Sequence, residues 1–76
     1  TFFYFRWYKY VNDVTLRLPS DARNDQQNFP NSSFTLTEDG TVKFPSVVNN
    51  DQGDYFCVAQ NSAGEGRGDL QSIYTG

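Results

Sequence analysis

The sequence contains no histidine and only one cysteine, Cys57, among its 76 residues. Without histidine, the chain lacks the commonest general base and metal ligand, and no other residues suggest a nucleophile–base pair. A single cysteine cannot form a zinc site of the usual cysteine spacing. We therefore expect no enzyme activity, no cofactor and no metal site within these residues.

Basic residues and long apolar runs are also scarce. Six Lys and Arg residues against nine Asp and Glu residues give a formal net charge of −3. No basic cluster is available to neutralise phosphates, so neither nucleic acid nor an anionic membrane surface is an expected partner. No apolar run approaches the roughly 20 residues that a transmembrane helix needs. We expect no direct membrane insertion within this chain.

Short strand-like segments account for most of what is present. Aromatic residues make up 17% of the chain, enough to indicate a packed core rather than disorder. Alternating apolar residues predict strands at 2–10, 14–19, 33–37, 41–47, 54–60 and 69–75. Turn-forming residues predict turns or loops at 11–13, 20–32, 38–40, 48–53 and 61–66. No helix longer than one turn is expected, and the pattern predicts an all-β sandwich or barrel.

One constellation, Asp51-x-Gly53-x-Tyr55-x-Cys57, has a mechanical interpretation. A tyrosine two residues before the cysteine can donate its hydroxyl to backbone upstream and so fix the chain as it enters the strand. Gly53 permits a tight backbone conformation at that corner. Trp7, far upstream on another strand, is expected to cover the cysteine from the facing side.

These residues resemble the immunoglobulin superfamily. Trp7 is similar to its strand C tryptophan, "DQGDYFC" to its strand F signature, and "QNSAG" to the F–G hairpin of I-set domains. The segments "WYK…NDVTLRLPSDAR", "NSSFTLTEDGTVKFPSV" and "DQGDYFCVAQNSAG" resemble the second, membrane-proximal domain of the junctional adhesion molecules, over about residues 5–74. The resemblance implies a single partial immunoglobulin-like β-sandwich at 1–76, with strands C to G present and strands A and B missing.

The same resemblance implies a function. The chain would be an extracellular module of a single-pass plasma-membrane adhesion receptor, binding other cell-surface proteins homophilically or heterophilically and spacing them at cell contacts. Two alternatives stay open: an intracellular I-set module of a cytoskeletal scaffold, and part of the ectodomain of a receptor kinase. The family's homodimer contacts lie in its first domain, so no adhesive residue is carried over.

Cys57 would form a disulfide with a cysteine on strand B in this superfamily. Six residues precede Trp7, whereas strand B would lie a dozen or so residues before that tryptophan. We therefore expect the partner of Cys57 outside these 76 residues, as in a truncated domain. The alternative is a free thiol that pairs with another chain.

Two short motifs suggest contacts with sugar or protein. Asn31 begins an Asn-Ser-Ser triplet and is predicted to carry an N-linked glycan, which fits an extracellular setting. Arg67, Gly68 and Asp69 form the tripeptide that integrins recognise, a weak motif by itself. We expect the tripeptide at the start of the last strand rather than at a loop tip, where integrin recognition would need it.

Two further contacts are predicted from position alone. Asp51 is expected either to pair with Arg23 across one end of the sandwich or to be a solvated carboxylate. Tyr8, Tyr10 and Phe56 are predicted to be exposed on one sheet, either as a lateral contact surface or as core left uncovered.

Overall fold

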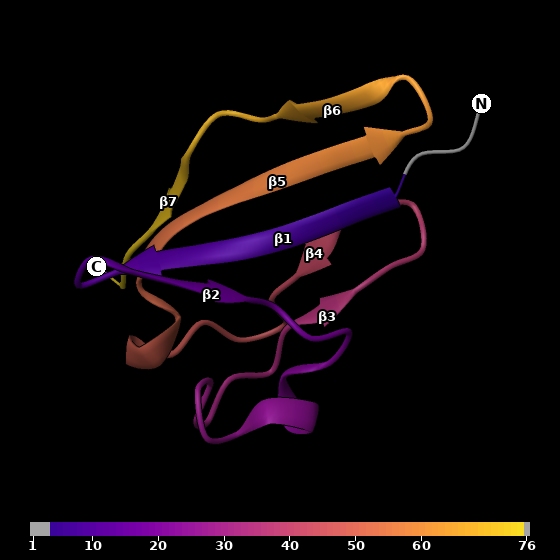
Figure 1. Cartoon of the computed structure of the whole chain (residues 1–76). Coiled ribbons are helices and arrows are strands. Elements are labelled where there is room, and N and C mark those ends of the chain that lie inside the picture. Colours follow the sequence, from indigo (N-terminus) through magenta and orange to yellow (C-terminus); the bar gives the residue numbers. More distant parts are fainter. Residues whose placement is uncertain (1–3, 76) are drawn as a thin grey trace.

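The computed structural model describes residues 4–75 of the chain. Its backbone forms seven strands and two short 3-10 helices in this range (Figure 1): β1 (Tyr4–Val11), β2 (Val14–Arg17), η1 (Ala22–Asp25), β3 (Thr35–Leu36), β4 (Val42–Lys43), η2 (Asn49–Asp51), β5 (Gly53–Asn61), β6 (Gly64–Arg67) and β7 (Gln71–Ile73). The predicted all-β fold is confirmed. The first residues of the strand predicted over 2–10 lie outside the described residues.

The larger sheet is built on the two longest strands, β1 and β5. Its strand order is β2-β1-β5-β6, with β7 pairing the first part of β5, and every pairing is antiparallel. Asn12 and Asp13, with φ of 52° and 64°, form the two-residue turn from β1 to β2. Aromatic side chains alternate along β1, so both faces of this sheet carry rings.

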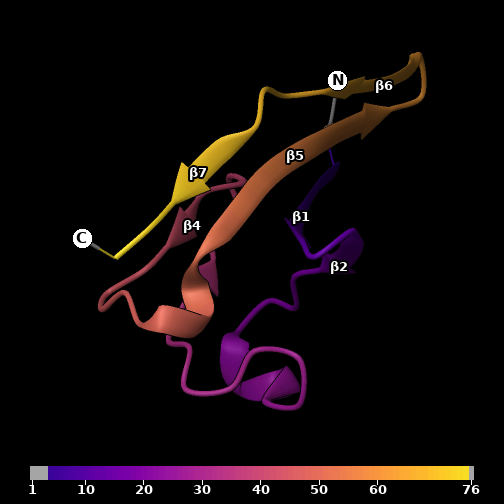
Figure 2. The same cartoon turned by 90° about the vertical axis from the view of Figure 1, so that its left-hand side faces the viewer.

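The smaller sheet pairs β3 with β4, in the register Leu36↔Val42. Figure 2 shows it on one side of the larger sheet, so the chain forms two layers. The core lies between them, and its buried members are Leu18, Ala22, Phe29, Phe34 and Tyr55. Edge-on and tilted ring contacts extend from Phe29 through Phe34 and Phe44 to Tyr55, with centroid distances of 5.2 to 5.7 Å. This packing links the smaller sheet to β5.

Several predicted boundaries were wrong, among them that of the strand predicted over 33–37, which is limited to Thr35–Leu36. The stretch 61–66 was predicted as a hairpin loop, but β6 begins at Gly64 and Asn61 already pairs with Gly64, which leaves a two-residue loop. The last strand was predicted over 69–75, but β7 covers Gln71–Ile73. The strand predicted over 41–47 is limited to Val42–Lys43. Loop-forming residues at the ends of these segments concealed where the hydrogen-bonded ladders begin and end.

Candidate functional site

Tyr55 fixes the corner at which the chain enters β5. Its side chain is buried, and its hydroxyl donates a 2.6 Å hydrogen bond to the carbonyl oxygen of Asp51. Burial raises the pKa of Tyr55 above its usual range, and the nearby Asp51 carboxylate raises it further. The hydroxyl therefore stays protonated and continues to donate. This is the hydrogen bond that the spacing from Asp51 to Tyr55 predicted.

Asp51 is neither paired with Arg23 nor solvated, so both predictions for it were wrong. Only 1% of Asp51 is exposed. Its carboxylate accepts a 2.6 Å hydrogen bond from the Ser32 hydroxyl and a 2.9 Å hydrogen bond from the Val48 amide. Neutral donors satisfy this buried carboxylate and tie the 32–34 segment to the entrance of β5.

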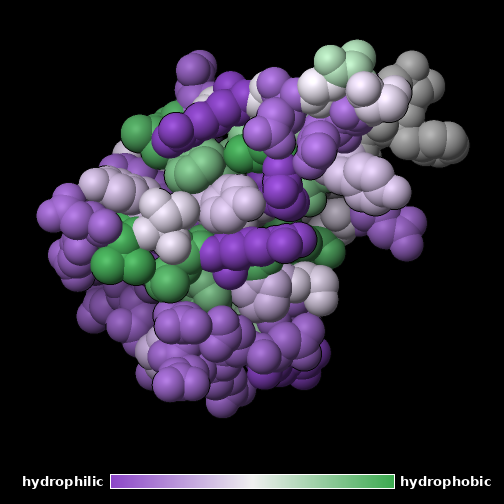
Figure 3. All heavy atoms as spheres, viewed as in Figure 1, coloured by the Kyte–Doolittle hydropathy of each residue, from purple (hydrophilic) through white to green (hydrophobic). Residues whose placement is uncertain are grey.

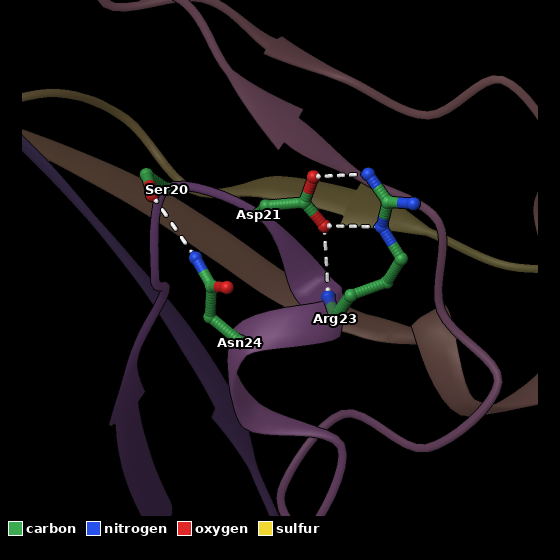
Figure 4. A network of polar contacts seen from close by, with 4 residues as sticks. All are labelled: Ser20, Asp21, Arg23 and Asn24. Carbon is green, nitrogen blue, oxygen red and sulfur yellow. Dashed lines mark hydrogen bonds and ion pairs between the residues drawn. The ribbon is translucent and has the colours of Figure 1, made fainter.

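Arg23 instead pairs with Asp21, as Figure 4 shows. The Asp21 carboxylate caps η1 by accepting the Arg23 amide at 2.8 Å, and the Arg23 guanidinium approaches the same carboxylate to 3.1 Å. The side-chain hydrogen bonds from Arg23 lower the pKa of Asp21. Asn24 donates to Ser20 beside this pair, at 3.3 Å. Arg23 is therefore paired with the residue that caps its own helix, and not with Asp51.

Lys9 is a buried cation that the sequence interpretation missed. It is 5% exposed, and its ammonium donates to the Asn50 carbonyl and lies 5.8 Å from the centroid of the Tyr55 ring. Burial lowers the pKa of Lys9, and the Asp51 carboxylate opposes part of this shift. A signal was present, because Lys9 shares its position in the two-residue alternation with the inward-facing Trp7.

Gly53 begins β5 directly beside Lys9. Its φ is +149°, and a Cβ at this position would lie 3.0 Å from Cε of Lys9 and 3.4 Å from the carbonyl oxygen of Tyr10. A side chain here would therefore disturb both the buried lysine and the backbone of β1. The role of Gly53 is to permit the close approach of β5 to β1.

Trp7 was predicted to cover Cys57 from the facing side. It lies instead beside Cys57 in the same sheet. The two residues are directly paired across β1 and β5, so they share a face. The Trp7 indole Nε1 donates a 2.7 Å hydrogen bond to the carbonyl of Gly40, in the turn between β3 and β4. The tryptophan therefore joins the two sheets next to the cysteine.

Cys57 is half-buried and lines an open hollow of about 550 Å³ between β4 and β7. Trp7, Phe44 and Ile73 contribute apolar walls to this hollow. Burial raises the pKa of the Cys57 thiol, which keeps it protonated and poorly nucleophilic. The thiol is free in this chain.

Arg67 ends β6, and Gly68 and Asp69 lie between β6 and β7. The tripeptide is therefore not at the tip of the β5–β6 hairpin, but it is also not at the start of the last strand, where it was predicted. All three are exposed. The Gly68 amide donates a 2.8 Å hydrogen bond to the Cys57 carbonyl, and the Arg67 guanidinium lies over the Phe56 ring at 4.0 Å from its centroid. Both contacts hold the start of the tripeptide against the sheet.

Asn31 is exposed and has φ of 62°, within a turn that precedes β3. The two serines of its triplet point their hydroxyls at protein acceptors: Ser32 donates to Asp51, and Ser33 donates to the Ser46 carbonyl at 3.1 Å. The asparagine is thus accessible while the residues after it are fixed.

The aromatic residues on the outer face of the larger sheet differ in exposure. Tyr10 is 40% exposed, but Phe56 is only 8% exposed, so its predicted exposure was wrong. Tyr8 stacks on Phe56 with the ring centroids 5.2 Å apart, and Arg67 covers the same ring. Neighbouring side chains therefore bury Phe56 on the outer face, away from the core between the sheets.

Residues 4–75 contain neither a cluster of metal-binding side chains nor a membrane-spanning helix. No three acidic, cysteine or histidine side chains in this range are grouped so that they could hold a metal ion. No helix in the same range is long and apolar enough to cross a bilayer.

The chain is similar in sequence to known adhesion proteins. The chain is 42% identical over 71 residues to junctional adhesion molecule C of Rattus norvegicus and of Homo sapiens, and 41% identical to that of Mus musculus. Each match covers 92% of the chain but 21% of the relative, so the chain spans about a fifth of the length of these proteins. No family model and no solved structure matched. The chain is thus similar in sequence to part of junctional adhesion molecule C, and its two-sheet, all-β architecture is that of an immunoglobulin-like β-sandwich fragment.

Proposed function

We propose that the chain is an extracellular module of a cell-surface adhesion receptor, acting by protein–protein recognition and by spacing at cell contacts. The observation that carries this proposal is the 42% identity to junctional adhesion molecule C over 92% of the chain. The chain spans 21% of that relative. We therefore also propose, as part of the same function, that the parent protein has one membrane span and that the chain is its membrane-proximal domain.

The architecture supports a spacing role. The described residues extend 38 Å along their longest axis and 23 and 21 Å along the other two. The core and the Trp7 indole join the two sheets. The Tyr55 hydroxyl fixes the chain where it enters β5. A module braced in this way can hold its two ends at a fixed separation between a membrane and a partner.

Integrin binding through Arg67, Gly68 and Asp69 is a weaker candidate, and we do not propose it. Exposure of the three residues favours it. The cation–π contact of Arg67 and the hydrogen bond of Gly68 oppose it, because integrin recognition needs the tripeptide on a protruding loop. Cell attachment to the immobilised chain that is lost on Asp69→Glu would reverse this judgement.

A bead assay tests the adhesion proposal. The secreted chain is captured on beads through a tag at one end, and attachment to cell monolayers and to other beads is counted. We expect attachment above that of beads carrying an unrelated immunoglobulin-like domain at equal density. The Tyr55→Ala chain, which loses a buried ring and its hydrogen bond, is the unfolded control. Attachment equal to both controls would overturn the proposal.

A further inference from the structure

We propose that the outer face of the larger sheet is a docking surface for an extended acidic segment of a partner protein. This inference rests on the proposed function and adds the chemistry of the partner. We define the basic face as Arg6 and Tyr8 of β1, Arg17 of β2, Phe56 of β5 and Arg67 of β6. In Figure 3, strongly hydrophilic side chains lie across this sheet with paler and apolar atoms between them.

Strand register places these residues on one face. Arg17 is paired with Tyr8, and Tyr8 with Phe56, so the three side chains form one row across β2, β1 and β5. Arg6 lies two residues from Tyr8 and shares its face. The contact of Arg67 with the Phe56 ring adds β6 to the same surface.

Charge is distributed unevenly over the molecule. The basic face holds three of the chain's six cationic residues, although the chain as a whole carries nine carboxylates and a net charge of −3. The three remaining cations lie elsewhere, together with most of the carboxylates. Two carboxylates share this face within residues 4–75: Glu65 bonds to Arg6, and Asp54, two residues before Phe56, accepts a hydrogen bond from the Ser72 hydroxyl. The end of the face that carries the arginine row is therefore complementary to an acidic partner.

Arg67 is arranged to receive a carboxylate. Its guanidinium lies over Phe56 at 4.0 Å, and Phe56 is itself stacked on Tyr8 with an interplanar angle of 19°. A guanidinium centred over a ring can keep the N–H groups on its edge available for a bidentate contact. Stacking also limits the side-chain freedom that binding would remove.

Arg17 and Arg6 complete the electrostatic argument. Neither Arg17 nor Arg67 forms an ion pair within the described part of the chain. Arg6 does, with its Nη2 2.9 Å from Glu65, but its Nε is buried there without a hydrogen-bond partner. The Glu65 side chain is 58% exposed, so an incoming carboxylate can displace it and give the Arg6 group a better acceptor.

The row also sets the length of the occupant. Arg17 and Arg67 lie three strands apart, which is about 14 Å at the usual strand spacing. An extended segment covers that distance in about four residues. We therefore infer two acidic positions about four residues apart, with an apolar or aromatic side chain between them to contact Tyr8. This alternation of charge and ring fits a peptide better than a uniformly sulfated sugar.

The test measures binding of a defined peptide to the 76-residue chain. The probe is a fluorescein-labelled peptide with a pair of glutamates on each side of a central phenylalanine, and its all-glutamine version is the neutral probe. Fluorescence anisotropy should show binding of the acidic probe alone, weakening as salt is raised. The double variant Arg17→Gln/Arg67→Gln should bind about tenfold more weakly or worse.

Matched variants separate this face from overall charge. Arg23→Gln/Lys43→Gln removes two cations elsewhere and should leave affinity within about twofold of the original chain. Arg67→Lys keeps the charge but loses the planar contact, and should weaken binding by less than the double variant does. Circular dichroism verifies the fold of each chain. The single variant Arg17→Gln, at an exposed position, keeps the test decisive if the double variant unfolds.

Four results would overturn the inference. They are no binding of the acidic probe, equal weakening by the Arg23/Lys43 variant, binding of heparin fragments but not of the peptide, and arginine-dependent self-association in sedimentation. The last two would assign the face to a sugar or to a second copy. The bead assay keeps the two proposals apart: adhesion without peptide binding defeats only this inference, and peptide binding without adhesion defeats only the adhesion role.

Discussion

The Trp7 indole donates a 2.7 Å hydrogen bond to the Gly40 carbonyl and so connects β1 to the turn of the other sheet. Gly40 has φ of +91°, and a Cβ on it would lie 2.7 Å from the Phe5 ring, so the turn approaches β1 as closely as glycine allows. This contact is one bridge between the layers that does not depend on a disulfide. Its removal is therefore a direct test of how the two sheets are held together.

Trp7→Phe should lower the free energy of unfolding by about 1–3 kcal/mol, because it leaves the Gly40 carbonyl without its donor. Urea unfolding followed by circular dichroism measures the change. Tyr4→Phe, at a position that is 75% exposed, is the matched control and should have little effect. Equal stability of the Trp7→Phe and original chains would show that this bond does not join the sheets.

Tyr55→Phe should cost about 1–3 kcal/mol, because the buried Asp51 carbonyl loses the hydroxyl that donates to it at 2.6 Å. The ring itself is retained, so the change isolates the hydrogen bond from core packing. Tyr74→Phe, at a residue that is 67% exposed, is the control for losing a hydroxyl near the end of the described chain. Chemical unfolding of both variants gives the difference.

Lys9→Met should alter how stability depends on pH. The folded-state pKa of Lys9 is lowered by burial, so between that value and the ordinary 10.5 the unfolded chain holds a proton that the folded chain has released. Stability contributed by Lys9 therefore rises with pH through this window and falls as pH drops through the folded-state pKa.

The quantity to measure is the difference in unfolding free energy between the original chain and Lys9→Met, from urea curves at several pH values. Other titrating groups cancel in this difference. The unfolding free energy of the original chain should increase relative to that of Lys9→Met as pH rises toward 10.5. The exposed Lys43→Met should show no such trend, and a flat difference for Lys9→Met would contradict the burial of Lys9.

Cys57 should react slowly with iodoacetamide in the folded chain. Burial raises the pKa of its thiol above the ordinary 9.0, so the midpoint of the rate against pH should lie higher in the folded chain than in urea. Mass spectrometry of timed samples gives the rates. Identical midpoints in buffer and urea would mean that the thiol is not shielded by Trp7 and its neighbours.

Asn31 should carry a glycan when the chain is secreted from animal cells. Glycosidase treatment is expected to increase gel mobility, and Asn31→Gln should remove the shift. Asn28 is a suitable control, because Phe29 and Pro30 follow it and it is no acceptor. An unchanged mobility of the secreted chain would refute modification at this turn.

Spacing within the sequence predicted the corner of β5 well. The interval between Asp51 and Tyr55 is local, so a donor and an acceptor four residues apart meet almost independently of the rest of the fold. Period-two alternation similarly located β1, β2 and β5. These features depend on neighbours along the chain, which the sequence displays directly.

Contacts between distant segments were harder to predict. Asp51 takes its partner from Ser32, nineteen residues away, and nothing in the residue types favoured a serine over Arg23. The strand β6 was missed because two of its four residues are glycines, and its pairing with β5 comes from hydrogen bonds rather than side chains. Lys9 was overlooked because its charge concealed its inward position.

The concentration of arginines on one sheet of an acidic chain also makes the molecule electrically asymmetric. Such a distribution favours one orientation of the molecule as it approaches an acidic partner protein, before any atoms touch. Encounter would then begin with the larger sheet leading, and its rate would fall as ionic strength rises. Orientation during approach is thus set by Arg6, Arg17 and Arg67, residues that contribute little to holding the two sheets together.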